Sequence, residues 1–139
     1  MLDLTALEKA STSLTATLRE VNNKEFMTQL NKVQQDAMLA GAIQNFEFTY
    51  ELCWKFIRRW LTENLGATDV EGVTRRELFR LAHQHRLINN VDRWMVFHQA
   101  RKQAAHVYDS RIAQEVYQIA CDFDPQAQAL LQTLHEKND

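Results

Sequence analysis

The hydrophobic residues of this chain recur every three or four positions, which is the spacing of one face of an α-helix. The clearest stripe begins at Leu39 and ends at Leu61, with Gly66 following as the expected C-cap. The apolar surface is wider than this stripe, because it also includes Phe48, Leu52, Trp54, Phe56 and Trp60. We therefore expect this helix to be covered on more than one side, by other helices or by a second chain.

Helical spacing also covers most of the remaining chain. It runs from residue 2 to about residue 34. Within this range, the Asn22-Asn23 pair favours a break or a kink. The stretch GATDVEGV at 66–73 is the one long loop. The TRRE that follows it is a capping box, with Thr74 as N-cap and Glu77 at the third helical position.

Two further helices complete the chain. The connector INNVD offers Asp92 as the N-cap of a helix that reaches Arg101, and a last helix follows Asp109. Pro125 lies inside that last pattern and predicts a kink or a restart. The spacing predicts a single all-α domain over residues 1–139, an up-and-down bundle of about five helices.

Composition narrows the class of protein. Three Gly and one Pro are too few for a sandwich, a barrel or a Gly-rich phosphate loop. A net charge of −2 provides no overall basic field for nucleic acid, although a local patch remains possible. No run reaches the about 18 apolar residues of a membrane span. With no leader pattern and two cysteines, Cys53 and Cys121, in apolar helical runs, we expect a cytoplasmic protein with reduced core thiols.

The segment RKQAAHVYDS at 101–110 carries the candidate chemistry. Arg101 and His106 are five positions apart, which places them roughly 140° apart on a straight helix. A shared site therefore needs the helix to end near Ala105, or a second copy of the chain. Arginine matches phosphate oxygens and histidine exchanges protons near neutrality, so the pair suits metal-free cleavage of an RNA phosphodiester. On spacing alone, a solvated helix end is the more common explanation.

Several other polar residues have two interpretations. Glu51 is expected to pair with Lys55 at i,i+4, and Glu47 to be a surface carboxylate rather than a buried partner of Arg101. His83 and His85 lie on different helix faces, so no metal or other cofactor is expected. The remaining candidates form an RNA or nucleotide cleft or, more commonly, a solvated face: Lys55, Arg58, Arg59, Arg75, Arg76 and Arg80.

The tryptophans are candidates for buried contacts. Trp94 is expected in the core or at a dimer interface. Trp54 and Trp60 point to different faces of one helix, so one of them is a candidate anchor between two subunits.

Two segments resemble a known family. GAIQNFEFTYELCWKFIRRWL, from Gly41, resembles the second helix of the nucleotidyltransferase substrate-binding proteins, the HepT-like members of the HEPN superfamily. LINNVDRWMVFHQARKQAAHVYD resembles the family segment in which a Trp-containing helix leads into R-N-x-x-x-H-x-Y-D. The resemblance extends over nearly the whole chain and is weakest at its N-terminal end.

The resemblance implies a homodimer whose two R-x4-H motifs form one cleft. Active members are metal-independent endoribonuclease toxins, silenced when a separately encoded minimal nucleotidyltransferase transfers AMP to the motif's tyrosine. By this comparison Arg101 binds phosphate, His106 is catalytic and Tyr108 accepts AMP. Lys102 replaces the family's asparagine, and Lys102, Asp109 and Glu47 are candidate supporting residues. The alternative function is a non-catalytic substrate-binding subunit of a two-component nucleotidyltransferase.

Overall fold

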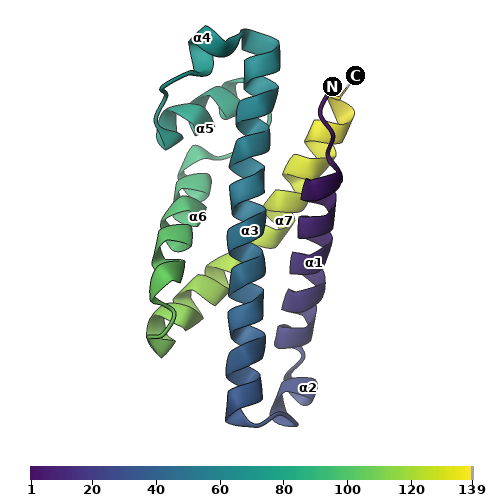
Figure 1. Ribbon diagram of the computed structural model, residues 1–139, viewed down its shortest axis with the longest axis vertical. Helices are drawn as coiled ribbons and strands as arrows, with labels where there is room; N and C mark the ends of the chain where they lie inside the picture. Colours follow the sequence, from purple (N-terminus) through teal and green to yellow (C-terminus); the bar gives the residue numbers. More distant parts are fainter. Residues whose placement is uncertain (139) are drawn as a thin grey trace.

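The computed structural model describes residues 1–138, which form seven α-helices and one short 3-10 turn. The helical bundle predicted from the sequence is therefore confirmed (Figure 1). The elements in order are α1 (Thr5–Asn22), α2 (Lys24–Thr28), α3 (Lys32–Leu65), α4 (Ala67–Val70), α5 (Arg75–Gln84), α6 (Val91–Gln103), η1 (Ala104–His106) and α7 (Ser110–Glu136).

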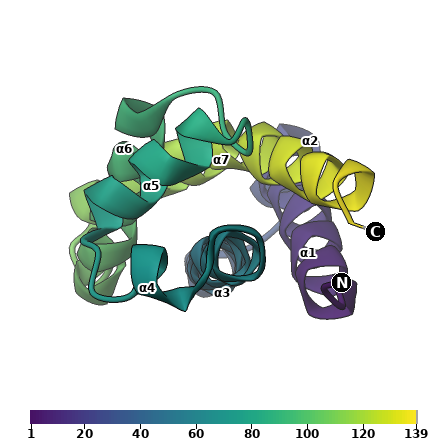
Figure 2. The same ribbon diagram turned by 90° about the horizontal axis from the view of Figure 1, so that it is seen from above.

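Helix α3 is the central element, and its 34 residues run the length of the bundle. Seen from above, α1 lies on one side of α3 and α5 with α6 on the other, while α7 connects the two sides (Figure 2). All five of α1, α4, α5, α6 and α7 contact α3. Other helices of the same chain thus cover most of the wide apolar surface of α3, while Phe48 is 59% exposed.

The core centres on Phe123 of α7, which is completely buried. Its ring meets Phe46, Trp94 and Phe97 edge to face, with ring centres 5.2, 5.7 and 5.0 Å away. Trp94 therefore belongs to the core, one of its two expected positions. Of the two cysteines, both of which are free thiols, Cys53 is buried and Cys121 is half-buried.

Two asparagines cap helices in the N-terminal part of the chain, and one of the two boundaries was predicted. The break expected at Asn22-Asn23 is confirmed: α1 ends at Asn22, and Asn23 starts α2 by accepting a 3.1 Å hydrogen bond from the Phe26 amide. Asn31 then begins α3 with a reciprocal capping box to Gln34, 2.9 Å in each direction. The central helix therefore starts at Lys32, well before the stripe at Leu39.

The other caps are a mixture of confirmed and wrong predictions. Gly66 is the C-cap of α3, with φ 97°, and Thr74 caps α5 by accepting from the Glu77 amide at 3.2 Å. Within the expected loop, residues 67–70 form the short helix α4. Asp92 is not the N-cap of α6: Asn90 accepts from the Arg93 amide at 3.0 Å, and Asp92 pairs with Arg76 at 3.1 Å.

Helix α7 continues through Pro125, so the helix does not restart there. Contacts with α1 hold the helix on both sides of the proline. Thr15 donates to Asp124 at 2.6 Å, and Gln128 donates to Thr15 at 3.0 Å. In residues 1–138, no helix combines the length and the apolar character needed to cross a membrane.

Candidate functional site

The backbone changes course between Arg101 and His106. Helix α6 ends at Gln103 and the 3-10 turn η1 carries residues 104–106 before α7 begins at Ser110. A helix end near Ala105, one of the two arrangements that a shared site would require, is thus present. Asp109 caps α7, since its Oδ1 accepts from the amides of Arg111 and Ile112 at 2.9 and 3.4 Å. Its observed role is to start the last helix directly behind the polar segment.

Arg101 is held by two carboxylates on successive turns of α3. Its Nη1 lies 3.2 Å from Glu47 and its Nε 3.3 Å from Glu51, and all three side chains are about one-third exposed. Of the two interpretations of Glu47, the contact with Arg101 is the one observed, because the last turn of α6 brings Arg101 over it. The cation of Arg101 is already paired with two anions in the folded chain.

Glu51 departs from its expected partner as well. The predicted pair with Lys55 does not form; Glu51 instead accepts a 3.0 Å hydrogen bond from the indole of Trp54 and contacts Arg101. Lys55 is exposed and its Nζ lies 5.8 Å from the centre of the Trp54 ring. The carboxylate of Glu51 therefore contacts both Arg101 of α6 and Trp54 of α3.

His106 and Tyr108 form an exposed pair on the turn. The hydroxyl of Tyr108 lies 3.3 Å from Nδ1 of His106, and Tyr108 is 85% exposed. The two rings meet edge to face at 5.9 Å. Tyr108 also borders a hollow of about 440 Å³ against the first turns of α3 and α7, which Lys32 and Val107 line as well.

Within residues 1–138, no hydrogen bond or ion pair joins Arg101 to His106. Both lie at the junction of α6 and η1, each with different partners. Lys102 is exposed and extends from the last turn of α6. In the described part of the chain, His, Cys, Asp and Glu side chains form no group of three or more suited to a metal ion.

The sequence reasoning missed His98 and Tyr50. Tyr50 is fully buried, and its hydroxyl lies 2.8 Å from Nδ1 of His98. Burial lowers the pKa of His98 below its usual range, and the positive charges of Arg75 and Lys102 lower it further. Burial likewise raises the pKa of Tyr50. His98 precedes Arg101 by one helical turn, and this spacing was a signal that the two share a face.

Comparison with known proteins gives a consistent result. Residues 2–136 match the family described as nucleotidyltransferase substrate binding protein like. A Haemophilus influenzae protein named probable ribonuclease HepT is 30% identical over 138 residues, covering 99% of this chain and 94% of that protein.

A solved structure from the same organism has a TM-score of 0.93 and 30% identity, covering 96% of this chain and 99% of the other. That structure is described as the fold of a substrate binding domain of a nucleotidyltransferase. Match length and identity together show that the chain belongs to the nucleotidyltransferase substrate binding protein-like family.

Proposed function

We propose that this protein is the toxin of a two-gene module: a cytoplasmic, homodimeric, metal-independent endoribonuclease silenced by adenylylation of Tyr108. The partner is a separately encoded minimal nucleotidyltransferase. The observation that carries the proposal is the exposed His106–Tyr108 pair, hydrogen-bonded at 3.3 Å on the turn that follows Arg101. The name of the Haemophilus relative, probable ribonuclease HepT, points to the same activity.

In the cleavage step, the imidazole of His106 removes the proton from a ribose 2′-hydroxyl, whose oxygen attacks the adjacent phosphorus. The bond from phosphorus to the 5′-oxygen breaks, leaving a 2′,3′-cyclic phosphate. The leaving oxygen takes a proton from the imidazolium of His106 of the partner subunit. Arg101 stabilises the charge on the phosphoryl oxygens with its guanidinium.

In the silencing step, the hydroxyl of Tyr108 attacks the α-phosphorus of ATP and pyrophosphate leaves. Nδ1 of His106 lies next to that hydroxyl and is placed to receive its proton. The product replaces a neutral phenol with a phosphodiester anion and a nucleoside. Its charge competes for nearby cations, and its bulk fills the space that an RNA phosphate needs.

The alternative, a non-catalytic subunit that binds substrate for the nucleotidyltransferase, is supported by a different observation. Arg101 is already neutralised by Glu47 and Glu51. A phosphate has to displace at least one carboxylate, which weakens the case for a preformed nuclease site. The solved relative is described as a substrate binding domain, in keeping with this alternative.

The decisive variant is His106→Ala, because His106 is exposed and its one side-chain hydrogen bond in the described chain is to Tyr108. Expressed without the nucleotidyltransferase, the parent is expected to arrest growth and cleave RNA, and His106→Ala to do neither. His83→Ala, which changes another exposed histidine, is the matched control. A harmless parent, or a His106→Ala variant as harmful as the parent, contradicts the nuclease proposal.

The modification is tested by intact mass. Co-expression with the nucleotidyltransferase is expected to add one or more AMP units to the parent and none to Tyr108→Phe. An unchanged parent mass together with a stable complex of the two proteins supports the binding-subunit alternative instead.

A further inference from the structure

His98 presents one ring nitrogen to solvent, one helical turn before Arg101. Its Nδ1 lies 2.8 Å from the hydroxyl of Tyr50, whereas its Nε2 has no hydrogen-bond partner within residues 1–138 and stays accessible to solvent. Because Arg101 and Lys102 follow His98 by three and four positions, the three side chains share one face of α6. The open nitrogen of His98 therefore lies beside two cations.

Tyr50 determines which nitrogen of His98 carries the proton. Burial raises the pKa of Tyr50, so the phenol keeps its proton. A buried hydroxyl needs an acceptor, and in the described chain Nδ1 of His98 is its one hydrogen-bond partner. A neutral imidazole that accepts at Nδ1 carries its own proton at Nε2. The open nitrogen of His98 is therefore a hydrogen-bond donor and not a base.

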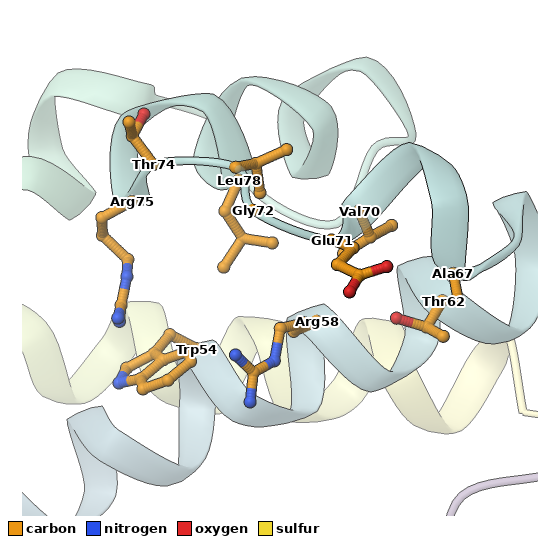
Figure 3. A pocket seen from close by; sticks show the side chains of 11 residues that line it. Trp54, Arg58, Thr62, Ala67, Val70, Glu71, Gly72, Thr74, Arg75 and Leu78 are labelled. Carbon is orange, nitrogen blue, oxygen red and sulfur yellow. The ribbon is translucent and has the colours of Figure 1, made fainter.

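Arg75 reaches the same cluster from the first turn of α5. Figure 3 shows its side chain extending to Trp54, and its guanidinium carbon lies 3.5 Å from the centre of that ring. Burial has the largest effect on the pKa of Tyr50 and of His98, and the positive charge of Arg75 lowers both pKa values. A guanidinium donates hydrogen bonds and accepts none, so Arg75 does not take the phenolic proton. Its charge also disfavours a second proton on His98, which keeps the ring neutral.

Arg101 is paired by charge but is incompletely hydrogen-bonded. It lies 3.2 Å from Glu47 and 3.3 Å from Glu51, yet its Nε is buried and donates no hydrogen bond within the described residues. A phosphate that reaches Arg101 has to displace a carboxylate, whereas the open nitrogen of His98 has no anion to lose. Lys102 is exposed and forms no ion pair in the described chain. The face thus offers one neutral donor and one free cation beside the paired guanidinium.

A phosphodiester strand is the ligand that suits this face. Its phosphates repeat along the strand, so neighbouring phosphates meet donors on neighbouring turns of a helix. Arginine and lysine attract phosphate oxygens by charge, and a neutral imidazole N–H adds a directional hydrogen bond. Because this imidazole carries no charge, it forms no ion pair with the carboxylates that already surround Arg101.

We infer that His98 is an RNA-binding residue of the proposed nuclease site. Its Nε2–H donates to the phosphate next to the scissile one, on the side away from His106, while Arg101 contacts the scissile phosphate. Tyr50 is the positioning residue that keeps the proton of His98 at Nε2. This inference rests on the proposed ribonuclease function, because it names how the same site holds its substrate.

The test is the binding of the full chain to a fluorescent 2′-O-methyl oligoribonucleotide of mixed sequence, measured by anisotropy. This strand keeps its phosphates and is not cleaved, because the attacking hydroxyl is blocked. His98→Ala is expected to weaken binding about tenfold, the effect of losing one hydrogen bond to a charged group. Gln99→Ala, at the exposed next position, is the matched control and is expected to bind like the parent. An uncharged methylphosphonate strand is expected to bind equally weakly to the parent and to His98→Ala.

Two conservative variants locate the donor on the ring. The amide of glutamine reaches the place of Nε2, and that of asparagine reaches only the place of Nδ1. His98→Gln is therefore expected to recover most of the affinity that His98→Ala loses, and His98→Asn to recover none of it.

The salt dependence of binding separates a neutral donor from a cation. Lys102→Ala is expected to reduce the slope of log affinity against log salt concentration by about 0.7, the contribution of one cation on a single strand. His98→Ala is expected to leave this slope unchanged, because a neutral side chain releases no counterion.

Tyr50→Phe tests the positioning role. It is expected to weaken binding about threefold, and to have no further effect when His98 is already alanine. Tyr117→Phe is the matched control, because it removes another tyrosine hydroxyl, the one that donates to Asn22, at a buried residue away from this face. It is expected to leave RNA binding unchanged.

The inference is overturned by any of four results. These are no saturable binding by the parent, equal affinities of His98→Ala and Gln99→Ala, equal affinities of His98→Gln and His98→Asn, or a fall in salt slope as large in His98→Ala as in Lys102→Ala. A parent that binds the strand through His98 but neither cleaves RNA nor arrests growth contradicts the nuclease proposal alone. The two failures are therefore distinguishable.

Discussion

Replacing Arg101 with alanine is expected to destabilise the fold as well as to remove a candidate phosphate ligand. In the described chain, Arg101 is the ion-pair partner of both Glu47 and Glu51, at 3.2 and 3.3 Å. These carboxylates are one turn apart on α3, and each is about one-third exposed. Without the guanidinium, two like charges face each other in a half-buried groove.

The size of the effect follows from these contacts. Each partly exposed ion pair contributes up to about 1 kcal/mol after solvent screening. Like charges at i,i+4 cost a further ~0.2–0.5 kcal/mol. The sum is about 2 kcal/mol in the free energy of unfolding, which corresponds to a fall in Tm of roughly 5–8 °C for a domain of this length.

Urea unfolding, followed by far-UV circular dichroism, measures this difference, with Lys102→Ala as the control on the next, exposed residue. Combining Arg101→Ala with Glu47→Gln in a double-mutant cycle is expected to give a coupling energy of about 1 kcal/mol. An Arg101→Ala variant within about 0.5 kcal/mol of the parent would refute the reasoning. Loss of toxicity in Arg101→Ala therefore has to be interpreted together with the measured stability of that variant. His106→Ala changes an exposed residue, so its loss of toxicity can be read directly.

Three other predictions concern the fold. The lowered pKa of His98 means that this imidazole binds a proton more readily in the unfolded chain than in the folded one. The free energy of unfolding is therefore retained above a pH of about 6.5 and falls as the pH drops below it. His98→Gln should show a weaker pH dependence of this free energy. Asn31→Ala removes the side-chain half of the capping box at the start of α3, and chemical denaturation is expected to show a loss of about 1 kcal/mol, while Gln29→Ala outside the box shows less. Phe123→Ala opens a cavity among Phe46, Trp94 and Phe97, and calorimetry is expected to show a loss of about 3–5 kcal/mol; a loss below 1 kcal/mol would mean that the core repacks.

The long helices were predictable because their buried residues recur with helical spacing and their caps are local. Gly66 and Thr74 act within a few residues of the backbone groups that they satisfy, so sequence alone located them. The start of α3 was not predictable from the stripe, because its first turns are largely exposed and carry no apolar pattern. Asn90 and Asp92 were equally good caps by residue type, and the backbone of the connector decided between them.

The candidate site was only partly predictable, because its partners come from different helices. A helix end near Ala105 was one of two arrangements that would let Arg101 and His106 share a site, and α6 does end at Gln103. The pairing of Glu51 was not predicted, because Lys55 is its neighbour on the same helix, whereas Arg101 approaches from α6. Sequence spacing identifies possible partners on the same helix, such as Lys55 for Glu51. The packing of α6 on α3 brings Arg101 to Glu51 instead.

A single line of contacts joins α5, α3 and α6. Arg75 lies against one face of Trp54, the indole of Trp54 donates to Glu51, and Glu51 pairs with Arg101. A phosphate that binds Arg101 has to compete with Glu51, because the carboxylate of Glu51 is shared between the indole N–H and the guanidinium. The packing of Trp54 on α3 therefore helps to determine how readily Arg101 exchanges a carboxylate for a phosphate.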